Sequence, residues 1–267
     1  QVLRGTLTQH LHRRPGKEGA VHVNMENDTI HGTAKIATIG LFMAFGYLCC
    51  NMKRYIFPLC ISLMLAFQCV AGAQDIKLPA ADQKRPTLQV SEALASRHSV
   101  REYDTRALSM QDLSDVCWAA CGMSRDTRHR TAPTARNLQE IRLFVFDQNA
   151  VYEYIAKDNC LKHLVAGDHR DLIAGGPFTQ KFVMDAPVSL LMVIDFDIYG
   201  SHDERALKMG CVDAGNVSEN INLFCEAAGL VTVPRASMDI EGICKLLGFT
   251  QQQLPIMNNP VGYPKKK

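Results

Sequence analysis

The spacing of apolar residues predicts helices in several parts of the chain. Residues 91–96 (SEALAS) are helix-like, and between Ser109 and Gly122 the apolar positions recur at helical intervals, with Ser109 placed as the N-cap and Gly122 as the stop. The stretch from Glu204 to Gly229 keeps apolar and small residues near one face and predicts one long helix. A further helix is expected within residues 236–249.

Other stretches carry the patterns of strands. Residues 141–147 and 151–155 each alternate apolar and polar positions around the turn QNA, which predicts a hairpin over 141–155. Residues 187–196 are almost continuously apolar, as in a strand covered on both faces. A short strand is expected at VTVP, residues 231–234. Helices before, between and after a few strands predict an α+β sandwich with an antiparallel or mixed sheet.

The segments between these elements are polar. Residues 74–90 are expected to be a linker, residues 123–137 a long loop, and the chain is expected to end in a proline-rich tail. Long loops in compact domains usually carry function. The sequence contains neither a dinucleotide-binding G-x-G-x-x-G after a strand nor a P-loop, a G-x-S-x-G elbow or an H-E-x-x-H zinc helix.

The N-terminal region has the pattern of an export signal. Lys53 and Arg54 precede an apolar run from Tyr55 to about Val70, and the small residues 71–73 follow, which predicts a signal peptide over 52–73 cleaved after Ala73. The alternative is a membrane-spanning helix, for which the run is short. We expect an exported protein, periplasmic or extracellular, without a stable membrane anchor after cleavage.

A second apolar run lies upstream, at residues 36–50. The simplest interpretation is that residues 1–51 are upstream-derived or introduced by cloning and form no part of the mature fold. The rival interpretation is a helical hairpin anchor made of both apolar runs. N-terminal sequencing of the exported protein separates the two.

Composition narrows the function classes. The 267 residues are 47% hydrophobic, and the formal net charge of +2 hides an asymmetry, because residues 74–267 carry 22 Lys and Arg against 24 Asp and Glu. A slightly acidic domain does not indicate nucleic-acid binding. Six of the ten cysteines follow the predicted cleavage site, without C-x-x-C or zinc-type spacing. Cys117 and Cys121, four apart, are expected to be small core residues, and a disulfide in an exported protein stays open.

Three stretches combine cations with other hydrogen-bond donors: residues 97–101 (RHSVR), 130–137 (RTAPTARN) and 262–267 (GYPKKK). A guanidinium with a nearby hydroxyl suits a phosphate, because the flat fork of donors and the O–H group meet several oxygen lone pairs. Each stretch by itself is more typical of a solvated charge cluster. Together they indicate an anion as the guest.

The order of these motifs resembles the nitroreductase-like family of FMN-dependent oxidoreductases. The resemblance runs from about Thr87 to Lys267 and is carried by R-x-S-x-R at 97–101, P-T-x-x-N at 133–137, G-L-x-x-V-P at 229–234 and the G-Y-P tail. The YEY hairpin and the segment GDHR are most similar to the branch that contains azoline-oxidising dehydrogenases. The resemblance implies an α/β/α sandwich over residues 91–267, with a mixed, mainly antiparallel central sheet, a long central helix and a homodimer with the FMN site at the subunit interface.

The resemblance also implies the cofactor contacts. Arg97, Ser99 and Arg101 match positions that hold the FMN phosphate and the polar edge of the flavin, with His98 between them, and Arg101 is the candidate for stabilising the reduced flavin. The loop that meets the flavin, often from the second subunit, matches Pro133, Thr134, Ala135 and Asn137. The remaining expected contacts are Val233, Pro234 and Arg235 near the ring and Lys265 and Lys266 near the phosphate.

The expected activity is an alternating transfer of electrons from NAD(P)H through FMN to a nitroaromatic, quinone or similar small acceptor. The alternatives are a flavin-sequestering protein without turnover and a dehydrogenase of heterocycles in a modified peptide. Two features leave the substrates open. The family often has an acidic residue after G-L-x-x-V-P, where this chain reads Arg235, Ala236 and Ser237. NAD(P)H is also expected to be scarce outside the cytoplasm, so the electron donor of an exported protein is undecided.

Overall fold

The computed structural model describes residues 74–175 and 180–266. The predicted upstream segment 1–51 and the predicted signal peptide 52–73 lie outside these residues. Within the described part no helix is both long enough and apolar enough to cross a bilayer.

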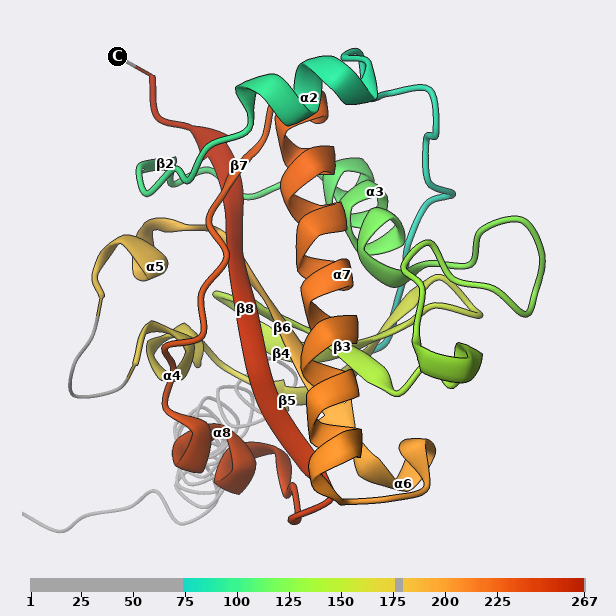
Figure 1. The fold of residues 1–267 in the computed structure, drawn as a ribbon. Helices are drawn as coiled ribbons and strands as arrows, with labels where there is room; N and C mark the ends of the chain where they lie inside the picture. Colours follow the sequence, from blue (N-terminus) through green and yellow to red (C-terminus); the bar gives the residue numbers. More distant parts are fainter. Residues whose placement is uncertain (1–73, 176–179, 267) are drawn as a thin grey trace, which may run out of the picture. The chain divides into compact units, whose positions relative to one another are not determined.

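Helices and strands alternate along the described chain (Figure 1). The helices are α2 (Val90–Ser96), α3 (Met110–Cys121), the 3-10 turn η1 (Ala135–Asn137), α4 (Arg170–Ala174), α5 (Phe182–Asp185), α6 (Phe196–Tyr199), α7 (Glu204–Ala228) and α8 (Ile240–Leu247). The strands are β1 (Ile76–Lys77), β2 (Tyr103–Asp104), β3 (Ile141–Asp147), β4 (Ala150–Ile155), β5 (Cys160–Ala166), β6 (Val188–Asp195), β7 (Val231–Thr232) and β8 (Gln253–Pro264).

The strands form one sheet in the order β1-β5-β4-β3-β6-β8-β2, with β7 also paired to β8. Every described pairing is antiparallel. The predicted hairpin over 141–155 is confirmed as β3 and β4, and the continuously apolar run 187–196 is β6, buried at every position. The α+β class and the mainly antiparallel sheet expected from the sequence are confirmed.

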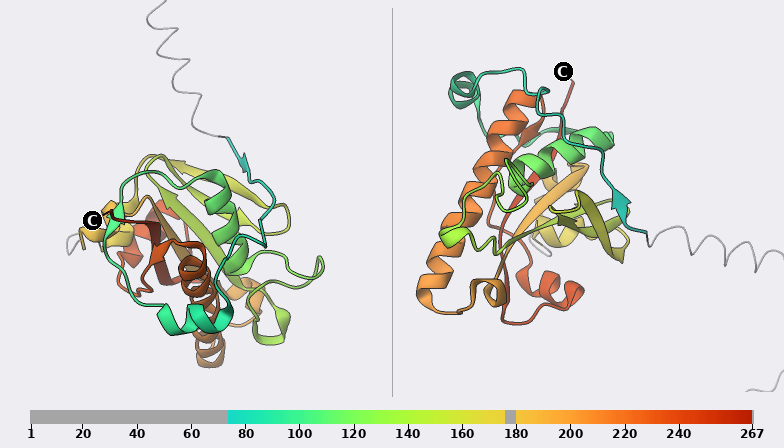
Figure 2. Two further views of the ribbon diagram at one scale, coloured as in Figure 1. Left: turned by 90° about the horizontal axis from the view of Figure 1, so that it is seen from above. Right: turned by 90° about the vertical axis from the view of Figure 1, so that its right-hand side faces the viewer.

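The sheet is covered on both faces, which makes a three-layer sandwich (Figures 1 and 2). Because side chains of a strand alternate between faces, β3 directs Leu143 and Val145 toward a core shared with α3 and α7. Its neighbours Phe144 and Phe146 point the other way, into a core shared with α4, α5 and α8. Burial on both faces explains why the central strands read as continuous apolar runs.

The two helices predicted with defined ends begin and stop as expected. The Ser109 hydroxyl accepts from the amide of Asp112 at the start of α3, and Gly229 ends α7 in the left-handed conformation, with φ 71°. In the interior of α7, a β-carbon added to Gly210 would lie 2.7 Å from the side chain of Ile194. The absence of a side chain at this position lets the helix approach β6 closely.

The prediction of a proline-rich tail is wrong, because these residues form the twelve-residue strand β8 in the interior of the sheet. Pro255 faces Val193 beside a register shift in the β6–β8 pairing, and Pro264 pairs with the two-residue strand β2 at the end of the ladder. Prolines are tolerated in strands at such irregular and terminal positions. Their number hid the strand from a pattern-based prediction.

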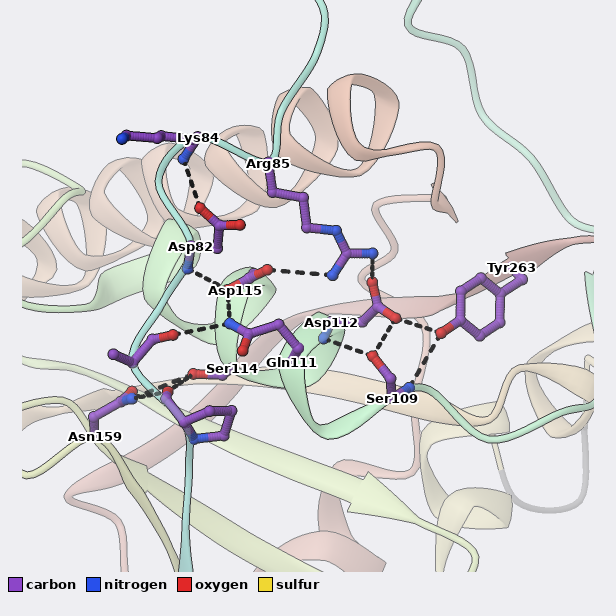
Figure 3. A network of polar contacts seen from close by, with 12 residues as sticks. Asp82, Lys84, Arg85, Ser109, Gln111, Asp112, Ser114, Asp115, Asn159 and Tyr263 are labelled. Carbon is purple, nitrogen blue, oxygen red and sulfur yellow. Dashed lines mark hydrogen bonds and ion pairs between the residues drawn. The ribbon is translucent and has the colours of Figure 1, made fainter.

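The predicted linker 74–90 also differs from the structure, since it is attached at several points. β1 pairs with β5, and Arg85 forms ion pairs with Asp112 and Asp115 of α3. Figure 3 shows this network, in which the phenol of Tyr263 from β8 also donates to Asp112. The segment is polar because it contacts buried carboxylates of α3. A linker has the same polar composition, so composition does not distinguish the two.

The cysteines and the tryptophan have structural roles. All six cysteines of the described part are free, and Cys117 and Cys121 are buried in the core as expected. Trp118 packs against the same core and its indole nitrogen donates to the carbonyl of Met123 at 2.9 Å.

Candidate functional site

Three of the four motif segments meet at one end of β8. In β2, which follows residues 97–101, Tyr103 pairs with Pro264, directly before Lys265 and Lys266. The amide of Val100 donates to the carbonyl of Thr232 at 3.0 Å, which brings in the segment 231–235. Segments separated by more than a hundred residues thus lie side by side (Figure 1).

Tyr103 anchors this meeting point. Its ring is buried, and its hydroxyl donates to the carbonyls of Val100 at 3.1 Å and Pro260 at 3.4 Å. Burial raises the pKa of this phenol, while the nearby guanidinium groups of Arg235 and Arg101 lower it. Tyr103 therefore stays neutral, and its hydroxyl fixes the segment at Val100 to β8 close to the two cations.

The predicted phosphate contacts are exposed or half-buried donors. Among described residues, no side-chain hydrogen bond or ion pair engages Arg97, Ser99 or Arg101, and Lys265 and Lys266 are exposed. His98 is exposed, and its Nδ1 lies 3.0 Å from the carbonyl of Ser96. The backbone of Arg97 ends α2, because its amide donates to the carbonyl of Ala93 at 2.9 Å. These side chains are available to an external anion.

Two arginines of the site face one aromatic ring. The guanidinium carbon of Arg235 lies 5.6 Å from the centroid of Phe182, the first residue of α5, and that of Arg101 lies 6.0 Å from it. Both distances are those of cation–π contacts. The ring and the two cations form what we call the Arg101–Phe182–Arg235 cluster.

Arg235 is held by neutral groups only. Its backbone exchanges two hydrogen bonds with Asn258, at 2.8 and 2.7 Å. Its side chain donates three hydrogen bonds. Nη1 donates to the carbonyl of Ile173 at 3.0 Å and to Oδ1 of Asn258 at 2.7 Å, and Nε donates to Oε1 of Gln180 at 3.3 Å. Nη2 is buried without a partner among described residues. Burial lowers the pKa of Arg235, and the like charge of Arg101 lowers it further.

The predicted loop 133–137 is elsewhere in the same chain. The amide of Ala135 donates to Oδ2 of Asp213 at 2.8 Å, and Nδ2 of Asn216 lies 3.4 Å from the carbonyl of Pro133. Fifteen residues of α7 separate Asp213 from Ala228, which corresponds to roughly 22 Å along a helix. The structure of one chain therefore does not bring Pro133, Thr134, Ala135 and Asn137 to the other predicted site residues.

This loop has an unusual backbone and rests on buried acids. Arg136 and Asn137 adopt positive φ values of 55° and 57°. Glu140 is fully buried, and neither of its carboxylate oxygens has a donor among the described residues. Burial and the neighbouring carboxylate of Asp213 raise the pKa of Glu140 from 4.5 to about 7. The loop is thus held by the hydrogen bond from the amide of Ala135 to Asp213, beside a second buried carboxyl group whose pKa is raised.

A cavity of about 320 Å³ lies between the start of α3, the β3–β4 turn and residues 184–188. Arg170 is its buried cation, and Asp168 and backbone carbonyls occupy its donors. None of the described side chains that line the cavity is a buried polar group without a partner. Among the described arginines, a buried nitrogen without a partner occurs instead on Arg235 and on Arg130.

Sequence reasoning missed Tyr103, Phe182, Glu140 and Asp213. Tyr103 directly follows the 97–101 motif, and this proximity was a usable signal. Phe182 is an ordinary aromatic residue in a polar stretch, and Glu140 and Asp213 are acids whose burial no local pattern reveals. Within the described chain, no three His, Cys, Asp or Glu residues are grouped as a metal site. The arrangement can bind an anion and a flat apolar group.

Comparison with known proteins agrees with this arrangement. The model of the nitroreductase family matches residues 94–263. A candidate nitroreductase of Methanocaldococcus jannaschii is 24% identical over 203 residues, which cover 72% of this chain and 98% of that protein. The crystal structure of a candidate nitroreductase from Ralstonia eutropha has a TM-score of 0.67 and 26% identity, and covers 74% of this chain and 92% of that one.

A third match concerns the fold alone. The crystal structure of a candidate NAD(P)H:FMN oxidoreductase from Staphylococcus epidermidis has a TM-score of 0.51 and 14% identity. The match covers 72% of this chain and 92% of that one.

Proposed function

The chain belongs to the nitroreductase family, and from this premise we propose that it is an FMN-dependent oxidoreductase. In this proposal it takes electrons from NAD(P)H and passes them to a nitroaromatic, quinone or similar small acceptor. The name of the Staphylococcus epidermidis fold neighbour, an NAD(P)H:FMN oxidoreductase, supports the choice of cofactor and donor.

The observation that carries the proposal is the meeting of residues 97–101, 231–235 and 262–266 at one end of β8. FMN presents a phosphate and a flat ring system. The unengaged donors of Arg97, Ser99 and Arg101 suit the anionic part. The residues present therefore fit the cofactor.

In this proposal each group has a distinct task. Bound FMN would supply a centre that accepts a hydride from one substrate and returns electrons to the next. Arg97 and Ser99, with Lys265, hold the phosphate through charge-assisted hydrogen bonds. Arg101 stabilises negative charge on the reduced cofactor. Val233 is buried and contributes an apolar wall.

The loop 133–137 enters the proposal through a second copy of the chain. It lies too far along α7 to reach residues 97–101 of its own chain. We therefore propose a homodimer in which Asn137 of each subunit completes the site of the other. The positive-φ backbone at 136–137 gives this loop a fixed shape for that contact.

Titration of the purified chain with FMN tests the cofactor assignment. Arg97→Ala is expected to weaken FMN binding by roughly 1.5 to 3 kcal/mol, which corresponds to about a 10- to 150-fold higher Kd. Lys162→Ala is the matched control, because Lys162 lies on β5, near the opposite edge of the sheet. A chain that is colourless and does not bind added FMN ends the proposal.

The same variant tests the shared site. In a mixed dimer of Arg97→Ala and Asn137→Ala chains, one of the two sites has both native residues, whereas neither homodimer has such a site. We expect mixing to restore about half of the wild-type FMN binding per mixed dimer. Binding that stays at the level of the homodimers contradicts a site built from two chains.

We also propose that the protein is exported through residues 52–73, so that the mature chain begins at Gln74. The proposed cleavage keeps β1, because Ile76–Lys77, which pairs with β5, follows Gln74. Mass measurement of the native protein, with its extracted cofactor, tests export and the cofactor together.

A further inference from the structure

The environment of Arg235 differs from that of an ordinary buried arginine. The residue is 8% exposed, and its hydrogen-bond acceptors are two amide oxygens and one carbonyl. The described groups whose charges act on it are Tyr103 and Arg101, and neither is a carboxylate. A buried guanidinium without a counter-charge is costly, and the unmade bonds of Nη2 add to the cost.

A second cation makes this cost larger. Arg101 faces the same ring from 6.0 Å, so that two like charges share one small region. Arg101 is exposed and could point into solvent at little cost, whereas Arg235 is fixed by its three bonds. The region therefore has a positive potential that favours the binding of an anion.

The shape of the cluster indicates what the anion is attached to. Phe182 is half-buried and presents a flat apolar ring between the two guanidinium groups. The buried part offers the N–H groups of a single nitrogen, Nη2, which suits one carboxylate better than a phosphate with three oxygens to satisfy. Arg235 contacts α4, β8 and Phe182 of α5. Arg97, Ser99 and Arg101 all belong to the segment after α2, and among these three the described contacts bring Arg101 to Phe182.

We propose that Arg235 binds the carboxylate of the substrate, and that the substrate is a planar aromatic acid stacked near Phe182. This inference rests on the proposed function and names the substrate class of its site. A neutral nitroaromatic or quinone is then a poor substrate, because it leaves the charge of Arg235 uncompensated. Specificity here follows from the unpaired cation.

Paired ligands of the same shape test the inference. 4-Nitrobenzoate and 4-nitrobenzamide differ mainly in charge, so the ratio of their Kd values reports the carboxylate contact. Both constants are measured by calorimetric titration, on the protein as isolated and after loading with FMN. The wild-type protein is expected to prefer the acid by about 10-fold or more, the scale of a charge-assisted hydrogen bond. The preference is expected to fall as salt is raised.

Arg235→Gln removes the charge and keeps an amide donor. In this variant the ratio of the Kd values of amide and acid is expected to fall to near one. Phe182→Leu is expected to weaken the binding of both ligands and to keep that ratio. Lys162→Ala, near the opposite edge of the sheet, is expected to leave both Kd values unchanged. Equal affinity of the wild-type protein for the two ligands overturns the inference, and this result does not depend on whether any variant folds.

Two further outcomes separate this inference from the proposed function. If Arg235→Gln loses FMN while its loaded fraction still prefers the acid, Arg235 belongs to the cofactor site and the inference is wrong. If the protein binds no FMN but prefers the acid, the proposed function fails and the anion site stands as a binding site only.

Discussion

Two buried arginines, Arg170 and Arg235, show how the same side chain serves opposite purposes. They are 9% and 8% exposed, and Arg170 begins α4 whereas Arg235 follows β7. Arg170 donates to both oxygens of Asp168, at 2.9 and 2.6 Å, and to the carbonyl of Ala186 at 2.7 Å. Arg235 has no carboxylate and one orphaned nitrogen among the described residues.

The pKa shifts of the two residues have opposite signs. The carboxylate of Asp168 raises the pKa of Arg170, whereas burial beside Arg101 lowers that of Arg235. A satisfied buried cation fastens two segments of the fold. An unsatisfied buried cation raises the free energy of the ligand-free protein, and a bound anion lowers that free energy again. Burial alone does not distinguish the two arginines, but the full set of partners does.

The largest expected effect comes from replacing each arginine by methionine, which has a similar length. Arg170→Met is expected to lower the free energy of unfolding by roughly 2 to 4 kcal/mol, because the carbonyls of Met184 and Ala186 and the carboxylate of Asp168 lose their donor. Arg235→Met is expected to stay within about 1 kcal/mol of the wild-type value, because removal of an uncompensated buried charge offsets the loss of its hydrogen bonds to Ile173, Gln180 and Asn258. Urea unfolding without ligand measures both, and an equal loss in both variants breaks the comparison.

A buried acid extends the comparison to negative charge. The pKa of Glu140 is raised to about 7, so the native state binds a proton that the unfolded chain releases near pH 4.5. The free energy of unfolding is then expected to decrease as pH rises from about 4.5 to 7, and to level off above. Glu140→Gln is expected to remove this slope and to gain roughly 2 kcal/mol at pH 8. Stability curves of both proteins between pH 4 and 9 measure it, and parallel curves contradict it.

The smallest expected effect is at Asp168, whose side chain is one-third exposed. The hydrogen bonds from Arg170 lower the pKa of this carboxyl, so its stabilising contribution is present above the pKa of the unfolded chain and is lost as pH falls through the lower folded pKa. Asp168→Asn is expected to cost about 1 kcal/mol at pH 7 and to weaken the acid dependence. Thermal unfolding at pH 3 and pH 7 measures the change. Asp126→Asn is the matched control, because the carboxylate of Asp126 is exposed to a similar extent and also has a lowered pKa, but contacts His129 instead of a buried cation.

Local patterns predicted most of the secondary structure for simple reasons. The caps and stops at Ser109, Gly122 and Gly229 act within a few residues, so their chemistry is visible in the sequence. The alternation of β3 and the apolar run of β6 report directly how many faces of a strand are covered. The strand β8 and the attached segment 74–90 were missed, because their partners are distant in the sequence.

The candidate site divides in the same way. The sequence alone determined which residue types were available: the arginines and serine of 97–101, the amide-bearing loop 133–137 and the lysine tail. Only the tertiary structure decided that Tyr103 joins the first and last of these beside Arg235, that the loop lies far along α7, and that Arg170 is paired while Arg235 is not. The physical reason is that chemical identity belongs to each residue, whereas burial and the missing partner of a charge depend on segments that only folding brings together.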